Sequence, residues 1–137
     1  MNHALLGVFD IPHLDRPLHV DFLVASSYGN ATVSSGTVRL VYDPETSLEG
    51  KHILLVEDIV DSGLTAQHLL KTLAKKKPKS LNVCALLAKH ERRVVNVHVE
   101  YVGFTVPNQY IVGYGLDYRQ KYRNLPFIGV LAKHMYE

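Results

Sequence analysis

Two long apolar runs, and the segment between them, dominate the pattern of hydrophobic and polar positions along the chain. Residues 52–57 (HILLVE) and 80–89 (SLNVCALLAK) are almost continuously apolar, which is typical of parallel strands covered on both faces. Over residues 64–75, apolar side chains recur every three or four positions, which predicts an amphipathic helix that ends before Pro78. We therefore predict a strand–helix–strand unit over residues 52–89.

Shorter apolar segments on either side of this unit predict further elements. The expected strands cover residues 18–26, 37–42, 99–106 and 110–115. A short helix is expected over residues 3–11, and residues 26–36 form a polar loop of the length that often carries function. Strands that alternate with helices predict an α/β fold.

Composition and charge narrow the class of protein. The chain has 137 residues and a net charge of +2, so we expect one domain and no nucleic-acid partner. The lysine-rich stretch at residues 71–79 reads as the solvated end of a helix. A single cysteine, Cys84, fits a reducing compartment, and the absence of a long apolar stretch or a basic leader predicts a soluble cytoplasmic protein without a membrane span.

A cluster of acidic residues follows the first long apolar run. Glu57, Asp58 and Asp61 lie within five positions, and SGLT (residues 62–65) comes next, where the predicted helix begins. The first turn of a helix has unpaired N–H groups and the positive end of the helix dipole, so it binds phosphate readily. The acids suit instead the hydroxyls of a sugar, a divalent cation or a proton. A ribose 5-phosphate suits both features, with its phosphate at the helix start and its hydroxyls at the acids. The alternative is that Asp61 or Ser62 simply caps the helix.

The motif LLVEDIVDSGLT, residues 54–65, resembles the phosphoribosyl-pyrophosphate motif of purine phosphoribosyltransferases of the hypoxanthine-guanine type. Three further segments resemble this family in the same order along the chain: VDFLVASSYG (20–29), CALLAKHERR (84–93) and YVGFTVPNQYIVGYGLDYRQKYRNLPFIGVL (101–131). The likeness covers about residues 17–131. It implies a type I phosphoribosyltransferase-like α/β fold, with a mostly parallel sheet flanked by helices, in a single domain over residues 1–137.

The resemblance also implies a reaction. Members of this family transfer 5-phosphoribosyl from phosphoribosyl pyrophosphate to hypoxanthine or guanine in purine salvage, giving IMP or GMP and pyrophosphate. The reaction uses Mg²⁺, so the expected partners are these substrates, purine nucleotides and the metal ion. We also expect a homo-oligomer, either a dimer or a tetramer. Which 6-oxopurine is preferred stays open.

Roles for the acidic cluster and the turn follow from the resemblance. Glu57 and Asp58 would contact the ribose 2′ and 3′ hydroxyls. Asp61 would be the catalytic acid or base near purine N7, where a carboxylate can hold the proton that moves as the ring changes bonding. The 5′-phosphate loop would consist of Asp61, Ser62, Gly63, Leu64 and Thr65. The family often has lysine where Leu64 stands, and we expect the change to be tolerated because the contact is largely through the backbone.

Roles for residues in the later segments follow in the same way. Lys89 would donate to the purine 6-oxo group, which favours a 6-oxopurine over adenine. Tyr110 would stack on the purine ring, and Ile111 would present backbone groups to the base. Asp117 would hold magnesium, with Glu57 and Asp58 as further candidate ligands.

The remaining roles concern pyrophosphate and water. Arg93 and Arg123 would approach the pyrophosphate. Ser27 and Tyr28 would begin a flexible loop that closes over the reacting centre and keeps water from the oxocarbenium-like ribose.

The sequence departs from the family at its start. The family has a longer N-terminal portion, with a strand that ends in a pyrophosphate-binding loop and with further parts of a hood over the purine. Aligned without gaps, Met1 and Asn2 fall at the end of that loop, so we expect the first core strand and part of the hood to be missing. Loss of backbone donors near the leaving group predicts weak or absent transferase activity, or activity restored by dimerisation.

Two readings from other classes compete with an enzyme. ILLVED (53–58) also resembles the start of phosphoacceptor receiver domains, but these need another strand-end aspartate well before Asp117, the next one after Asp61. The stronger alternative is a catalytically weak or inactive nucleotide-binding regulator of the same fold. Such a protein need not keep Asp61, Lys89 and Tyr110, all of which are present here.

Overall fold

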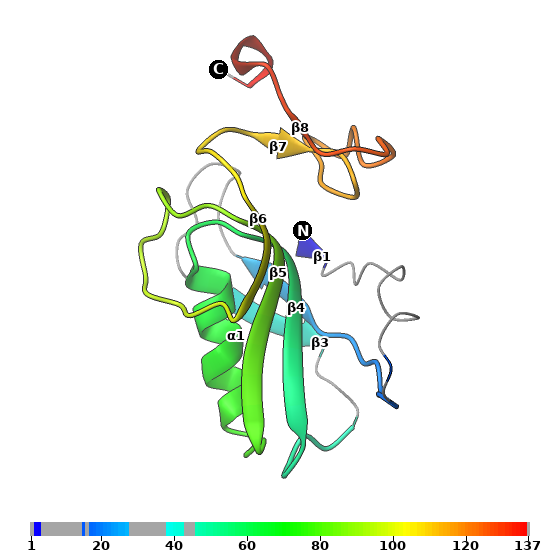
Figure 1. Cartoon of the computed structure of the whole chain (residues 1–137), viewed down its shortest axis with the longest axis vertical. Coiled ribbons are helices and arrows are strands. Elements are labelled where there is room, and N and C mark those ends of the chain that lie inside the picture. Colours follow the sequence, from blue (N-terminus) through cyan, green and yellow to red (C-terminus); the bar gives the residue numbers. More distant parts are fainter. Residues whose placement is uncertain (1, 4–14, 16, 28–37, 43–45, 137) are drawn as a thin grey trace.

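A parallel sheet of three strands, in the order β4–β5–β6, forms the centre of the molecule (Figure 1). The computed structural model describes residues 2–3, 15, 17–27, 38–42 and 46–136. The central strands are β4 (His52–Val60), β5 (Ser80–Ala88) and β6 (Tyr101–Thr105). The parallel pairing confirms the prediction drawn from the two apolar runs.

Helix α1 (Leu64–Ala74) connects β4 to β5 and lies along one face of the sheet (Figure 1). Leu69 and Leu73 on α1 are almost fully buried and pack with Leu55 of β4 and Val83 of β5. Burial of such side chains contributes roughly 1.5–3 kcal/mol each, so the apolar face of the helix holds it on the sheet. The predicted strand–helix–strand unit is therefore confirmed.

A second sheet is antiparallel and combines β1 (Asn2–His3), β2 (Val24–Ser27) and β3 (Val38–Tyr42) in that order. The prediction of a strand from residue 18 is wrong, since residues 18–23 are not in a strand. Their apolar side chains at Leu18, Val20 and Phe22 are exposed, so the alternating pattern does not face a core.

The predicted helix over residues 3–11 is not formed at its first position. His3 lies in β1, paired with Val24 of β2, and residues 4–11 lie outside the described ranges. Backbone pairing to a neighbouring strand has replaced the local helical pattern at this residue. In the predicted polar loop, the described positions 26 and 27 belong to β2.

The C-terminal segment lies beyond the carboxyl ends of the central strands (Figure 1). It contains β7 (Ile111–Val112), β8 (Gly129–Val130) and the 3₁₀ helix η2 (Lys133–Met135). Ile111 and Leu116 pack against Leu87 of β5, which fixes this segment to the sheet.

Some C-terminal boundaries differ from the prediction. The strand predicted over residues 110–115 is limited to β7, because the chain turns at Gly113 and Gly115, where φ is +91° and +93°. Side-chain periodicity alone does not report such backbone angles. None of the helices in the described ranges has the length and hydrophobicity that a bilayer span requires.

Candidate active site

Glu57 and Asp58 both lie within β4, which continues to Val60 rather than ending at Glu57 as the sequence suggested. Glu57 pairs in register with Ala85 of β5. The strand thus extends through both acids and ends just before Asp61.

The two carboxylates of β4 are poorly solvated. Oε1 of Glu57 is buried and has no hydrogen-bond partner within the described residues. Burial, followed by the negative charge of Asp58, raises the pKa of Glu57 to about 7. Burial also raises the pKa of Asp58, although the N–H of Ile59 donates to Asp58 Oδ1 at 2.6 Å and opposes this shift. Such groups gain from a ligand that donates hydrogen bonds, as sugar hydroxyls do.

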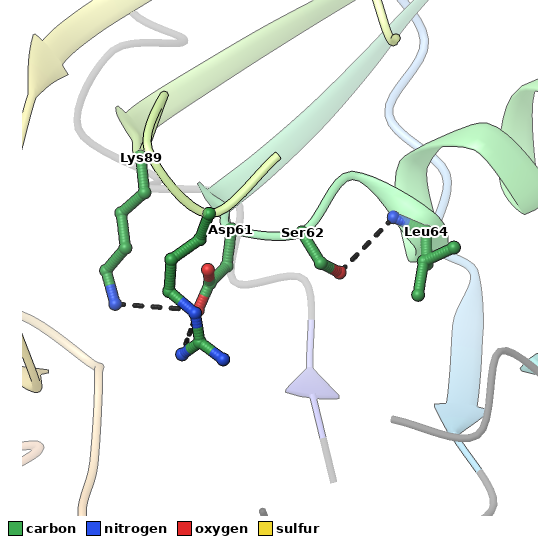
Figure 2. Close-up of polar contacts among 5 residues, drawn as sticks. Asp61, Ser62, Leu64 and Lys89 are labelled. Carbon is green, nitrogen blue, oxygen red and sulfur yellow. Dashed lines mark hydrogen bonds and ion pairs between the residues drawn. The ribbon is translucent and has the colours of Figure 1, made fainter. Parts of the chain in front are cut away.

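The turn that follows β4 leaves the start of α1 open. Gly63 is the N-cap residue with φ +84°, and no side chain caps the helix. The nearest side-chain contact is long, since the N–H of Leu64 lies 3.4 Å from Ser62 Oγ (Figure 2). The backbone N–H groups of the first turn are therefore available to an anion.

Lys89 immediately follows β5 and brings a cation to the same end of the sheet. It is only 5% exposed, the one charged residue that is buried in the described part of the chain. Lys89 Nζ lies 3.5 Å from Asp61 Oδ2 (Figure 2). The structure thus brings together a carboxylate and an ammonium group that are far apart in the sequence.

Two adjacent arginines in the loop after β5 take different positions. Arg92 Nη1 lies 3.4 Å from Asp61 Oδ2, whereas Arg93 Nη1 donates to the carbonyl oxygen of Val97 at 3.0 Å. The Arg93 side chain also packs behind the turn at residues 61–65, the candidate phosphate turn, where its Cδ lies 3.6 Å from the position of a Cβ added to Gly63. Arg92 was missed from the sequence, and the only available signal was its place three residues after Lys89.

The sequence profile of the phosphoribosyl transferase domain matches residues 6–119, which is most of the chain. The chain belongs to the phosphoribosyltransferase family. The type I fold and the resemblance identified from the sequence are thereby confirmed.

Relatives place this phosphoribosyltransferase in the hypoxanthine-guanine type. It is 50% identical to the hypoxanthine-guanine phosphoribosyltransferase of Bacillus subtilis over 93% of this chain and 71% of that protein. It is 47% identical to the corresponding protein of Mycobacterium avium, over 98% of this chain and 66% of that protein. The crystal structure of a Staphylococcus aureus hypoxanthine phosphoribosyltransferase matches with a TM-score of 0.87 at 41% identity, over 93% of this chain and 69% of that one.

The aromatic side of the site is formed by three tyrosines of the phosphoribosyltransferase. The Tyr110 ring meets Tyr118 edge-on, with centroids 5.2 Å apart, and Tyr136 at 5.4 Å. Tyr110 is 38% exposed, and burial, then the charges of Asp117 and Tyr118, raise the pKa of its hydroxyl. The next residue, Ile111, is buried in β7. Tyr110 is thus supported by other rings while part of its surface stays accessible.

Asp117 and Arg123 form the shortest ion pair recorded among the described residues. Asp117 Oδ1 lies 2.7 Å from Arg123 Nη2, and Asp117 Oδ2 accepts the N–H of Gln120 at 2.7 Å. Arg123 Nη1 also donates to the carbonyl oxygen of Gly115 at 2.7 Å. The charges of Arg123 and Asp117 both act on Asp58, so this pair lies near the end of β4.

The described residues do not assemble a ready metal site. They contain no group of three or more His, Cys, Asp or Glu side chains that could hold an ion, so Glu57, Asp58 and Asp117 do not form such a group. Magnesium commonly uses one or two carboxylates together with substrate phosphates, and Asp117 near Asp58 fits that smaller requirement. Of the predicted closing loop, Ser27 ends β2, and Tyr28 lies outside the described ranges.

Proposed function

We propose that this phosphoribosyltransferase transfers 5-phosphoribosyl from phosphoribosyl pyrophosphate to N9 of hypoxanthine or guanine, giving IMP or GMP and pyrophosphate. The observation that carries the proposal is the position of Lys89 beside Asp61, directly before an uncapped helix start. An ammonium group, a carboxylate and an open helix start lie at one end of the sheet, which supports the proposed reaction. The named activities of the relatives from Bacillus subtilis and Mycobacterium avium support the same reaction in purine salvage.

The sugar phosphate would occupy the end of β4 and the following turn. The 5′-phosphate binds to the loop of Asp61, Ser62, Gly63, Leu64 and Thr65, chiefly through backbone N–H groups. Glu57 and Asp58 accept hydrogen bonds from the ribose hydroxyls, which satisfies the unpartnered Glu57 Oε1. Binding of the sugar thus relieves the unfavourable burial of these carboxylates.

The purine would lie between Lys89 and Tyr110. The ammonium of Lys89 donates to the 6-oxo group, Tyr110 stacks on the ring, and the backbone of Ile111 contacts the base. The bond from ribose C1 to the pyrophosphate oxygen breaks and a bond from C1 to N9 forms. Asp61, beside purine N7, holds the proton that the base gives up.

The pyrophosphate and its metal would lie towards Asp117 and Arg123. We propose that Asp117, partly through water, holds Mg²⁺ with Asp58 and Glu57 as neighbouring acceptors. When bound, this ion neutralises charge on the diphosphate oxygens. Arg123, and Arg93 after release from Val97, are the proposed cationic contacts of the leaving group.

The proposal also covers the loop that begins at Ser27, the oligomeric state of the protein and its location. Ser27 and Tyr28 begin a loop that closes over the reacting centre and excludes water. The protein acts as a homo-oligomer in the cytoplasm. A purely regulatory nucleotide-binding role is not favoured, because the relatives reported above are named as enzymes.

Pyrophosphate release with phosphoribosyl pyrophosphate, Mg²⁺ and each of hypoxanthine, guanine and adenine tests the proposal. Transfer to the two 6-oxopurines and none to adenine is the expected result. Asp61→Asn should keep IMP binding while losing about 100-fold in turnover, as removal of a general acid or base does. Binding of nucleotides by wild-type protein without any transfer would support the regulatory alternative instead.

A further inference from the structure

Two cations lie near one carboxylate oxygen of Asp61, and among the described residues none is recorded near the other oxygen. Lys89 Nζ and Arg92 Nη1 lie 3.5 Å and 3.4 Å from the same oxygen, Oδ2. Charge-assisted hydrogen bonds are normally about 2.7–2.9 Å, so both contacts are loose. Oδ1 is buried and has no hydrogen-bond partner within the described residues. The carboxylate is therefore oriented by charge from one side only.

The proposed function gives Lys89 a second task. When the purine binds, the ammonium that faces Asp61 must also donate to the 6-oxo group of the base. Lys89 is buried at the end of β5. Its backbone N–H donates to the carbonyl of Val60 at 3.0 Å, so the backbone is fixed and only the side chain can adjust. Any turn of the ammonium towards the base weakens its contact with Asp61.

Arg92 is placed to compensate for this loss. Its side chain is 48% exposed and is anchored to Asp61 alone among the contacts of the described residues. Arg93 cannot take this role without rearrangement, because its guanidinium is bound to Val97 behind the phosphate turn. The planar guanidinium of an arginine also presents several donors in a fixed arrangement, which suits the orientation of a carboxylate.

We propose that Arg92 is a positioning residue that holds the Asp61 carboxylate in place when Lys89 engages the purine. This inference rests on the proposed function. Arg92 itself touches neither substrate, and it acts through Asp61. Its contribution is therefore expected in the chemical step and not in the binding of phosphoribosyl pyrophosphate, whose proposed contacts do not include Arg92.

Steady-state kinetics with hypoxanthine on the full chain test the inference. Arg92→Gln should lower kcat about tenfold, within the range found for contacting pairs in double-mutant cycles, and should change the KM for phosphoribosyl pyrophosphate less than about twofold. Arg92→Lys should recover part of the loss, because it keeps the charge. Lys75→Gln, which removes an exposed cation at the end of α1, is the matched control and should match wild type.

The Asp61→Asn background separates positioning from other roles. There, with single-turnover rates as the readout, Arg92→Gln should change the rate less than about twofold, since the carboxylate it orients is gone. An equal tenfold loss in both backgrounds, or no loss in either, would overturn the inference while leaving the proposed function intact. A wild-type protein without transfer would overturn the proposed function first. Thermal unfolding of each variant shows whether the fold is retained.

Discussion

Lys89 Nζ lies 3.5 Å from Asp61 Oδ2, and the two residues follow neighbouring parallel strands, β5 and β4. The backbone N–H of Lys89 donates to the carbonyl of Val60, so the pairing of the strands brings the two residues to the same end of the sheet. A buried ammonium needs a partner, and Asp61 is the only carboxylate recorded within ion-pair distance of it among the described residues. The sheet therefore positions both groups before any substrate binds.

Replacement of Lys89 by methionine should remove the preference for 6-oxopurines. Methionine keeps much of the length and volume of the lysine, but it cannot donate to the 6-oxo group. We expect kcat/KM for hypoxanthine to fall about 100-fold or more, because a site built around a hydrogen bond loses strongly when one partner is removed. Lys75→Met, at an exposed position, is the matched control. A variant with unchanged kcat/KM would show that Lys89 does not contact the base.

Gly63 and Gly50 form a matched pair for testing the phosphate turn. Both have positive φ, at +84° and +71°, so alanine is strained at either site by about 1 kcal/mol. A Cβ at Gly63 would lie 3.1 Å from Val95 Cγ2 and 3.3 Å from the carbonyl oxygen of Val95, whereas Gly50 has nothing within 4 Å.

Gly63→Ala should therefore lower the free energy of unfolding more than Gly50→Ala does, and only Gly63→Ala should weaken binding of IMP. Urea unfolding and calorimetric titration with IMP measure the two effects. An equal loss of stability in both variants would mean that only the backbone angle matters. Unchanged IMP affinity in Gly63→Ala would argue against the phosphate turn.

The central unit could be predicted because its signals are long and agree with one another. The apolar runs at residues 52–57 and 80–89 and the three- to four-residue spacing over residues 64–75 predict neighbouring elements of one unit, and the burial of Leu69 and Leu73 matches the spacing. Short segments gave weaker predictions. Residues 18–23 alternate like a strand but are not in one, and the side chains of Leu18, Val20 and Phe22 are exposed. His3 pairs as a strand although its neighbours suggested a helix.

The resemblance to the family placed the acidic cluster and Lys89 in one site, and in the structure they lie at the ends of neighbouring parallel strands. The choice between Arg92 and Arg93 could not be made in this way. Hydrophobic periodicity does not distinguish adjacent residues of a loop. In the structure, the loop is joined to the turn before α1, because the backbone N–H of Val94 donates to the carbonyl of Ser62 at 3.1 Å. That contact joins the loop to the turn, where Arg93 packs against Gly63 and Arg92 lies beside Asp61.

Tyr110 offers a test of the stacking role. Tyr110→Ala removes the ring and should raise the KM for hypoxanthine about 10-fold to 100-fold, since stacking of a base on an aromatic ring contributes roughly 1–3 kcal/mol. Tyr110→Phe keeps the ring and should remain within about threefold of wild type. Steady-state kinetics at saturating phosphoribosyl pyrophosphate provide the measurement. A large effect of both substitutions would assign the role to the hydroxyl group instead.

Glu57 should make the stability of the free protein depend on pH. Its pKa is raised from 4.5 to about 7 by burial and by the charge of Asp58. Between these two values the folded chain keeps a proton that the unfolded chain has lost. The free energy of unfolding contributed by this group is therefore highest at low pH and decreases as pH rises towards 7.

Glu57→Gln removes this titration and keeps the shape of the side chain. At about pH 8 the variant should be more stable than wild type by about 1–3 kcal/mol, and at about pH 5 the difference should be much smaller. Urea unfolding at both pH values, without ligand, is the measurement. Glu49→Gln, at an exposed position before β4, is the control and should show no such difference. Parallel pH profiles for wild type and Glu57→Gln would mean that solvent or a bound ion stabilises the ionised carboxylate in the folded chain.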